Sequence, residues 1–244
     1  MDYNGLINLN TVVYTFFGVL PSLVWLVFYL AKDLHPEPRR MILRIFLWGA
    51  LIAIPTAFIE KGLKEILVNS GIDMVSIGYK VILFFVIVAP VEEFFKYIVV
   101  KVKVMNSPHL DEPVDIMLYM VISALGFAGL ENILYLFQYG ERIAETLSLS
   151  LVRFIGAIFL HTLCSAIIGY ALAISFCEIK RKGLIVATGF LAAITLHGMF
   201  NFILVTLPDS ASYPLVAFIM VTSAFIIFTG FEKLKKKKGI CKIR

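Results

Sequence analysis

Three ionisable side chains interrupt a long hydrophobic stretch of this chain. Glu92, Glu93 and Lys96 lie within the apolar run from Met74 to Val100. About 20 apolar residues, each advancing a helix by roughly 1.5 Å, are enough to cross the hydrocarbon core of a bilayer. A charge at the centre of a bilayer costs at least ~2.5 kcal/mol on insertion scales, so these residues need charged partners or a water-filled cavity. We therefore predict a functional site here.

The spacing of these residues gives the two carboxylates different surroundings. In a helix Glu92 lies four residues and Glu93 three residues before Lys96, so the ammonium can neutralise one carboxylate while the other, about 100° round the helix, stays free. Two such carboxylates differ in how readily they bind a proton, which supplies one acid and one base. Pro90 removes a backbone N–H and loosens the helix where water would enter. The alternative is a salt bridge that only holds helices together.

Further polar residues occur in the later hydrophobic runs. They are Glu131, Asn132, Arg153, His161, His197 and Asn201. His197 and Asn201 are four residues apart, so they lie on one helix face and can address one oxygen atom together. Arg153 precedes His161 by about two turns and can pair with Glu131 or close a cavity. A single histidine in a membrane span often only hydrogen-bonds a neighbouring helix, but ionisable residues from four helices indicate a shared site.

Carboxylates and imidazoles in a partly dry cavity can activate a water molecule. A glutamate can act as the general base, a histidine can donate to a leaving amine, and His or Asn donors can stabilise an oxyanion. The sequence has no His-Glu-x-x-His, no Gly-x-Ser-x-Gly and no Tyr-Asp paired with Gly-x-Gly-Asp. Peptide hydrolysis would therefore depend on glutamate. The two Glu and two His could instead bind a metal, since imidazole and carboxylate are zinc ligands.

The elements that must position these residues are hydrophobic helices. The 244 residues are 60% hydrophobic and only 16% charged, with a mean hydropathy of +0.90, which is too apolar for a soluble domain. We predict an all-α polytopic transmembrane bundle of about seven spans. The expected spans are Thr11–Leu30, Met41–Ile59, Met74–Val100, Val114–Gln138, Ser148–Cys177, Leu184–Thr206 and Tyr213–Phe231.

The spans are expected to form one integral-membrane domain, residues 1–244. Its motif-bearing core is about 74–206, and a basic cytoplasmic tail is expected over 232–244. No loop is longer than about 15 residues, so we expect no soluble domain and no ATP-binding module.

The basic residues predict how the chain is oriented in the cell membrane. Sixteen of the 22 lysines and arginines fall in one set of alternate loops and in the C-terminal tail. This bias places the N-terminus outside and the C-terminus in the cytoplasm, in agreement with an odd number of spans. It also explains the net charge of +5 without a nucleic-acid partner. The run Lys235–Lys238 is expected to anchor the tail near anionic lipid.

The motifs together resemble those of a known family. Four of them follow one another on successive spans: Glu92-Glu93-x-x-Lys96, Phe127-x-x-x-Glu131 followed by Asn132, an isolated His161, and His197-x-x-x-Asn201. In this order they resemble the PrsW family of intramembrane proteases, which is grouped with type II CAAX-prenyl endopeptidases and bacteriocin-processing proteins. The resemblance runs from about Pro90 to Asn201, over nearly half of the chain.

The resemblance implies a metal-independent glutamate protease without a cofactor. Glu92 would be the base, Glu93 and Lys96 its electrostatic frame, and His197 and Asn201 the oxyanion site. The implied catalytic residues are Glu92, Glu93, Glu131, His161, His197 and Asn201, and the supporting residues are Lys96, Phe127, Asn132 and Arg153. The chain departs from the wider group in having Lys96 where an Arg is usual one position further on. It also has Glu131 where a His is usual, so His161 or Glu131 itself would take over that role.

The same resemblance implies a substrate. PrsW-like proteases are implied in cutting a single-span anti-sigma factor, the first step in releasing a transcription factor under envelope stress. Glu92 is expected about eight residues from the cytoplasmic end of its span and Glu131 nearer the outer end, which leaves the side of entry open. Membrane lipids are the other expected partners.

Two other classes of protein fit the same residues. In a proton-coupled transporter, Glu92, Lys96, Glu131 and His197 would relay protons. In a non-catalytic scaffold or immunity protein, the same fold would have no chemical role.

Overall fold

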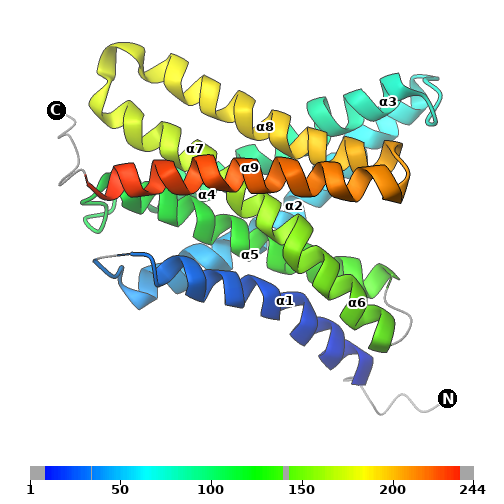
Figure 1. Cartoon of the computed structure of the whole chain (residues 1–244), viewed down its shortest axis with the longest axis horizontal. Coiled ribbons are helices and arrows are strands. Elements are labelled where there is room, and N and C mark those ends of the chain that lie inside the picture. The colour runs from blue at the N-terminus through cyan, green and yellow to red at the C-terminus, as the bar shows by residue number, and fades with distance from the viewer. Residues whose placement is uncertain (1–8, 34, 140–142, 237–244) are drawn as a thin grey trace.

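The chain is a bundle of long helices. The computed structural model describes residues 9–33, 35–139 and 143–236, and these ranges contain helices, turns and loops but no strand (Figure 1). The all-α prediction is confirmed. In chain order the elements are α1 (Leu9–Leu30), α2 (Arg39–Asn69), α3 (Ile77–Val81), the π-helical η1 (Ile82–Val88), α4 (Ala89–Lys103), α5 (Pro113–Tyr139), α6 (Ile143–Arg153), the π-helical η2 (Phe154–Ile158), α7 (Phe159–Cys177), the short 3₁₀ segment η3 (Ile179–Arg181), α8 (Lys182–Thr206) and α9 (Asp209–Lys235).

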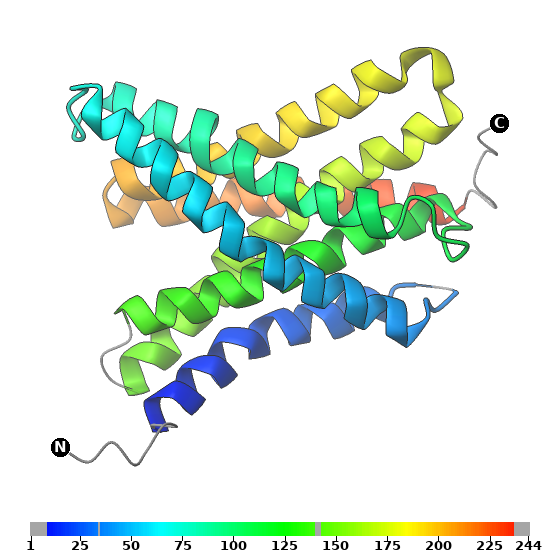
Figure 2. The ribbon, with the colours of Figure 1, turned by 180° about the vertical axis from the view of Figure 1, so that it is seen from behind.

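Six helices in the described residues are long and apolar enough to cross a membrane. They are Thr11–Leu30, Arg39–Asn69, Pro113–Tyr139, Ser150–Phe176, Lys182–Thr206 and Asp209–Lys235. The seventh predicted crossing is the continuous segment α3–η1–α4, which is more polar because it contains Glu92, Glu93 and Lys96. Figures 1 and 2 show this segment running the length of the bundle beside the others. Helix α1 begins at one end of the bundle and α9 finishes at the opposite end, as seven crossings require.

Helix α2 is longer than the sequence predicted. The second span was expected to end at Ile59, but α2 continues for ten residues to Asn69 and is followed by Gly71 in the left-handed conformation, with φ of 80°. Four charged residues, Glu60, Lys61, Lys64 and Glu65, made this stretch resemble a loop. Lysine and glutamate are good helix formers, and Lys61 and Glu65 are spaced as an i,i+4 pair, so the helix persists.

The predicted basic tail is partly helical. Within residues 232–244, α9 extends to Lys235 and Lys236 caps it. The remainder, 237–244, lies outside the described residues.

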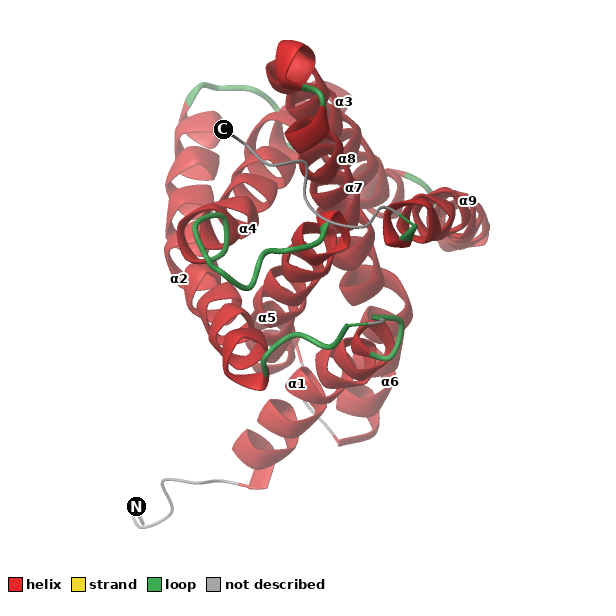
Figure 3. Cartoon of the chain, turned by 90° about the vertical axis from the view of Figure 1, so that its left-hand side faces the viewer, coloured by secondary structure: helices red, strands yellow, loops and turns green. Residues whose placement is uncertain are grey.

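Helix α5 forms the centre of the bundle. Its hydrophobic window is 94% buried, far more than that of the other spanning helices, and it packs against α1, α2 and α7. Figure 3, which views the bundle end-on, shows α5 enclosed by its neighbours. Gly126 of α5 lies against the backbone carbonyl of Phe46 in α2, where an added Cβ would overlap the oxygen. The small residue at this position therefore lets α5 and α2 pack closely.

Two π-helical segments precede the helices that carry the polar residues. Segment η1 leads into α4, which begins with Ala89-Pro90, and η2 leads into α7. The N–H of Ala89 donates to the carbonyl of Phe84, a wider loop than the α-helical pattern, just before Pro90 removes a donor. The local loosening predicted at Pro90 is therefore present. Segments of this kind occur frequently at functional sites.

Candidate active site

The centre of the site is a buried cluster on α4. The side chains of Glu93 and Lys96 are fully buried and that of Glu92 is 8% exposed. Lys96 Nζ donates to Glu93 Oε1 at 2.7 Å and lies 3.3 Å from Glu92 Oε2. The ammonium thus hydrogen-bonds one carboxylate and only approaches the other, the asymmetry predicted from their spacing. Ser123 of α5 fixes the same turn by donating to the Lys96 carbonyl at 3.0 Å.

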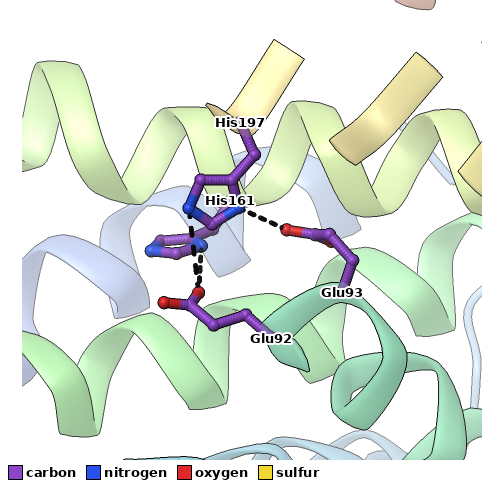
Figure 4. Close-up of side chains that lie close together, drawn as sticks. All are labelled: Glu92, Glu93, His161 and His197. Carbon is purple, nitrogen blue, oxygen red and sulfur yellow. Dashed lines mark hydrogen bonds and ion pairs between the residues drawn. The ribbon is translucent and has the colours of Figure 1, made fainter. Parts of the chain in front are cut away.

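His197 of α8 joins this cluster through Glu93. Its Nδ1 lies 2.8 Å from Glu93 Oε1, and its Nε2 faces Glu92 Oε2 at 3.9 Å. A carboxylate can only accept, so Nδ1 carries the proton in this pair. In the neutral ring the lone pair of Nε2 then points toward Glu92. Figure 4 shows His197 reaching down from its helix between the two carboxylates.

His161 of α7 links the buried cluster to Glu131. Its Nδ1 lies 2.8 Å from Lys96 Nζ and 3.6 Å from Glu92 Oε2, and its Nε2 lies 2.8 Å from Glu131 Oε2. An ammonium can only donate, so Nδ1 accepts from Lys96 and the Nε2–H donates to Glu131. Glu92 and Glu131, expected at different depths, therefore share one histidine and belong to one site. The rings of His161 and His197 meet edge to face, with centroids 5.2 Å apart.

Phe127 of α5 closes one side of the cluster. Its ring is buried, with the Lys96 Nζ 4.8 Å from its centroid and the His161 ring 5.8 Å away. The aromatic face is attracted to the ammonium and keeps water from that side of it. Phe127 thus lies where a supporting role was predicted for it.

Arg153 holds the outer end of the site. Its Nη2 lies 3.0 Å from Glu131 Oε1, which confirms one of the two roles considered for this residue. Its Nε donates to Asn132 Oδ1 at 2.6 Å, and Asn132 in turn donates to the carbonyl of Gly18 in α1 at 3.0 Å. The Glu131 side chain is 35% exposed whereas that of Glu92 is 8% exposed. The site is therefore closed at Glu92 and open at Glu131.

Asn201 contributes differently from the other predicted residues. It is half-buried on α8, one turn after His197, and among the described residues its side chain makes no hydrogen bond. All nine other predicted residues are joined by the contacts above. The amide of Asn201 remains free to bind a molecule that enters.

Glu60 of α2 is a residue that sequence reasoning missed. Its Oε1 is buried without a hydrogen-bond partner in the described residues, and its carboxyl interacts electrostatically with Glu92, Glu131 and Lys96. It had been placed beyond the end of the second span. A signal was present, because it continues at helical spacing the buried face formed by Gly49, Ala53 and Thr56 of α2.

Several buried acceptors in this site lack a donor in the described residues, Glu92 Oε2 and Glu93 Oε2 among them. Glu92 Oε2 has no hydrogen-bond partner among the described residues, and the lone pair of His197 Nε2 faces it at 3.9 Å. A buried carboxylate oxygen without a donor is costly. A water molecule that enters beside Glu92 can donate one O–H to its carboxylate and the other to His197 Nε2.

The same residues fit a divalent metal ion. Glu92, Glu93, His161 and His197 offer ligand atoms that all lie within 4.8 Å of one another. Glu92, His161 and His197 would hold the ion, with Glu93 and Glu131 orienting the outer nitrogens of the two imidazoles, as carboxylates do in metal sites. The hydrogen bond from Lys96 to His161 occupies one of those ligand nitrogens and would have to break.

Comparison with known proteins shows which family this sequence resembles. The sequence model of the PrsW family intramembrane metalloprotease matches residues 37–229. The chain is 34% identical to the protease PrsW of Oceanobacillus iheyensis over 189 residues, covering 77% of this chain and 80% of that protein. It is 30% identical to the protease PrsW of Geobacillus kaustophilus over 223 residues, with 91% of each protein covered. Identity to the Bacillus subtilis protease PrsW is 29%, over 91% of this chain and 94% of that protein. No solved structure matches the chain.

Proposed function

We propose that this chain, which belongs to the PrsW family of intramembrane proteases, cleaves a membrane-anchored protein with a water molecule activated by Glu92. As a family member it is a multi-pass membrane protease. Family membership favours this function over the transporter and the scaffold considered from the sequence. The observation that carries the proposed mechanism is the buried Glu92 Oε2, which has no hydrogen-bond partner among the described residues and faces His197 Nε2 at 3.9 Å.

A water molecule beside Glu92 Oε2 and His197 Nε2 is proposed to be the nucleophile. Its oxygen attacks the carbonyl carbon of the scissile peptide bond while Glu92 takes one of its protons as general base. Glu93 supports this role indirectly, since it holds the Nδ1–H of His197 and so aims Nε2 at the water. Lys96 keeps Glu93 ionised at that position by donating to it.

The remaining steps need a donor to the oxyanion and a proton for the leaving amine. We assign the oxyanion to the free amide of Asn201, whose N–H group can donate to it. The C–N bond then breaks, and the proton taken by Glu92 passes to the leaving amine. His161 holds Glu131 and Lys96 in place around the cleaved bond, so its proposed role is to position them.

The proposed mechanism is of the glutamate type and independent of metal. It is supported by the hydrogen bond of Lys96 to His161 Nδ1, a nitrogen that a metal would need. If a metal ion is bound, it would acidify the attacking water and polarise the carbonyl. Two measurements distinguish the metal-independent mechanism from a metal-dependent one. They are the metal content of the purified protein and its cleavage activity after chelation. Full activity without stoichiometric metal supports the glutamate type, and activity lost on chelation and restored by Zn²⁺ refutes it.

The substrate we propose is a single-span membrane protein of the anti-sigma-factor kind. The open end of the site at Glu131 is a route for an unwound segment of such a protein. We further propose that the N-terminus faces outward and the C-terminus the cytoplasm, on the grounds of the lysine and arginine bias. No nucleic acid is expected as a partner.

New N-termini in the membrane proteome test this proposal. Cells with the wild-type chain are compared, under envelope stress, with cells carrying Glu92→Gln or the control Glu65→Gln, an exposed glutamate near the end of α2. Termini that disappear only in Glu92→Gln would support proteolysis and identify the substrate. Identical profiles from equally expressed proteins would refute it.

A further inference from the structure

A basic pocket lies at the end of the bundle where α2 begins and α4 ends. It has a volume of about 640 Å³. The loops α1–α2 and α4–α5 meet at this end, as Figure 3 shows in the end-on view. Its basic lining residues are Arg39, Arg40 and Arg44 of α2, Lys103 of α4 and His109 of the α4–α5 loop. None of these residues takes part in the site around Glu92.

The cations of this pocket are not paired with the acidic residues at the same end of the bundle, since Glu37 accepts from Tyr119 and Glu112 pairs with His35. In the described ranges, none of Arg39, Arg40, Arg44 and Lys103 forms an ion pair with a carboxylate, and the arginines are exposed. Elsewhere in the bundle Lys96 and Arg153 are both paired with glutamates. Several unpaired cations around one pocket repel one another, so an anion that enters is stabilised by all of them.

The start of α2 adds to the positive field. Its N-cap, Pro38, provides no side-chain hydrogen bond, and the first turn contains no acidic residue. The first turn, which begins with Arg39 and Arg40, therefore has no side-chain capping acceptor, and both of these residues line the pocket. Helix N-termini with free N–H groups favour phosphate groups.

Apolar surface next to the pocket indicates that the anion belongs to a lipid. Leu43 and Leu47 of α2 and Val102 of α4 are exposed beside the basic residues. Trp48 is also exposed, and Lys103 Nζ lies 4.1 Å from its ring centroid. Tryptophan and lysine mark the interface between headgroups and acyl chains, so the pocket lies at headgroup level with leucines at acyl-chain level.

We propose that this pocket binds the phosphate headgroup of an anionic phospholipid, with its acyl chains along the exposed leucines of α2. Basic pockets between helices on the cytoplasmic side of a membrane are suited to such headgroups. Lys103 lies two turns after Lys96 on α4, so a bound headgroup also holds the end of the helix that carries the buried cluster. The binding itself does not depend on the protease function proposed above.

Binding is tested with the full chain in nanodiscs of phosphatidylcholine. Phosphatidylglycerol is titrated in, and bound lipid is counted by native mass spectrometry. The pocket variant is the triple change Arg39→Gln, Arg40→Gln and Arg44→Gln. The matched control removes three charges at the same end of the bundle but outside the pocket, with Lys180→Gln, Arg181→Gln and Lys182→Gln.

The expected result is a selective loss of lipid. Each cation that contacts the bound headgroup contributes about fivefold to affinity, so the pocket variant should bind phosphatidylglycerol roughly a hundredfold more weakly. The control should keep wild-type affinity, and both variants should keep wild-type helicity in phosphatidylcholine. Equal weakening of both variants, or none in the pocket variant, overturns the proposal.

Soluble phosphates separate the lipid from other sources of the same group. Inorganic phosphate and glycerol phosphate are added to the nanodiscs in place of phosphatidylglycerol, and thermal stability is measured. A lipid site predicts stabilisation by phosphatidylglycerol alone. Equal stabilisation by a soluble phosphate would show that the ligand is not a lipid.

Discussion

Glu92 and Glu93 are adjacent carboxylates, yet neutralising each of them should change the free energy of unfolding by very different amounts. Glu93 Oε1 receives hydrogen bonds from both Lys96 and His197, at 2.7 and 2.8 Å, whereas Glu92 Oε2 receives none in the described structure. Acidic groups also outnumber basic ones around this cluster, because Glu92, Glu93 and Glu131 share Lys96 and Arg153 and Glu60 lies within electrostatic reach. Removing the charge of Glu92 leaves the others paired.

The magnitudes follow from these contacts. Glu93→Gln loses two charge-assisted hydrogen bonds and leaves a buried ammonium with a weaker partner, so we expect a loss of about 3 kcal/mol in the free energy of unfolding. Glu92→Gln breaks no hydrogen bond and relieves the excess charge, so the change should stay within about 1 kcal/mol of zero. Cleavage should nevertheless be lost in Glu92→Gln, because the general base is gone.

The assay combines stability and activity for the same preparations. Unfolding of each purified variant is followed by circular dichroism as the denaturing detergent fraction is raised in mixed micelles, and cleavage is measured in proteoliposomes. Exposed Glu65→Gln on α2 serves as the control for a neutralised glutamate. Equal destabilisation by Glu92→Gln and Glu93→Gln would refute the reasoning, as would an active Glu92→Gln enzyme.

Three further predictions concern the surroundings of the site. Gly126→Val forces a side chain against a backbone carbonyl of α2, so folding in micelles should be lost or weakened by at least about 3 kcal/mol; near-native unfolding would contradict this packing. Arg153→Met leaves Glu131 and Asn132 without their shared donor and should cost about 2 kcal/mol, whereas Arg153→Lys, able to reach one partner, should recover part of it. Burial raises the pKa of Glu37, which precedes α2, so the folded state holds its proton more tightly than the unfolded state. Stability should then be greatest below the ordinary glutamate pKa and fall as pH rises through the folded value, and a pH series in Glu37→Gln should lack this fall.

Hydrophobic patterning was sufficient to predict the fold class and the six helices that are long and apolar enough to cross a membrane, because bilayer thickness fixes the length of each run. The end of α2 could not be predicted in this way. Charged residues such as Lys61 and Glu65 are excluded from lipid but not from a helix that extends beyond it. Glu60 was overlooked for the same reason, although its helix face continues into the bundle.

The residue types of the site were predictable, but their contacts were not. Spacing on one helix correctly indicated that Lys96 would favour one of the two glutamates. The sequence indicated a shared site for Glu92 and Glu131 but not the residue through which they meet. They meet at His161 because the helices cross at angles that sequence does not specify, as Figures 1 and 2 show. Pairing across helices depends on such crossing angles and on the π-helical segments before α4 and α7.

The central claim is that Glu92 activates water for peptide cleavage. The most direct measurement is the single-turnover cleavage rate of purified, folded Glu92→Gln relative to wild type, on a substrate identified from the membrane proteome. Loss of a general base predicts a fall of roughly 10² to 10⁴-fold with substrate binding retained. A rate within a few-fold of wild type would contradict the claim and move the catalytic role to another member of the cluster.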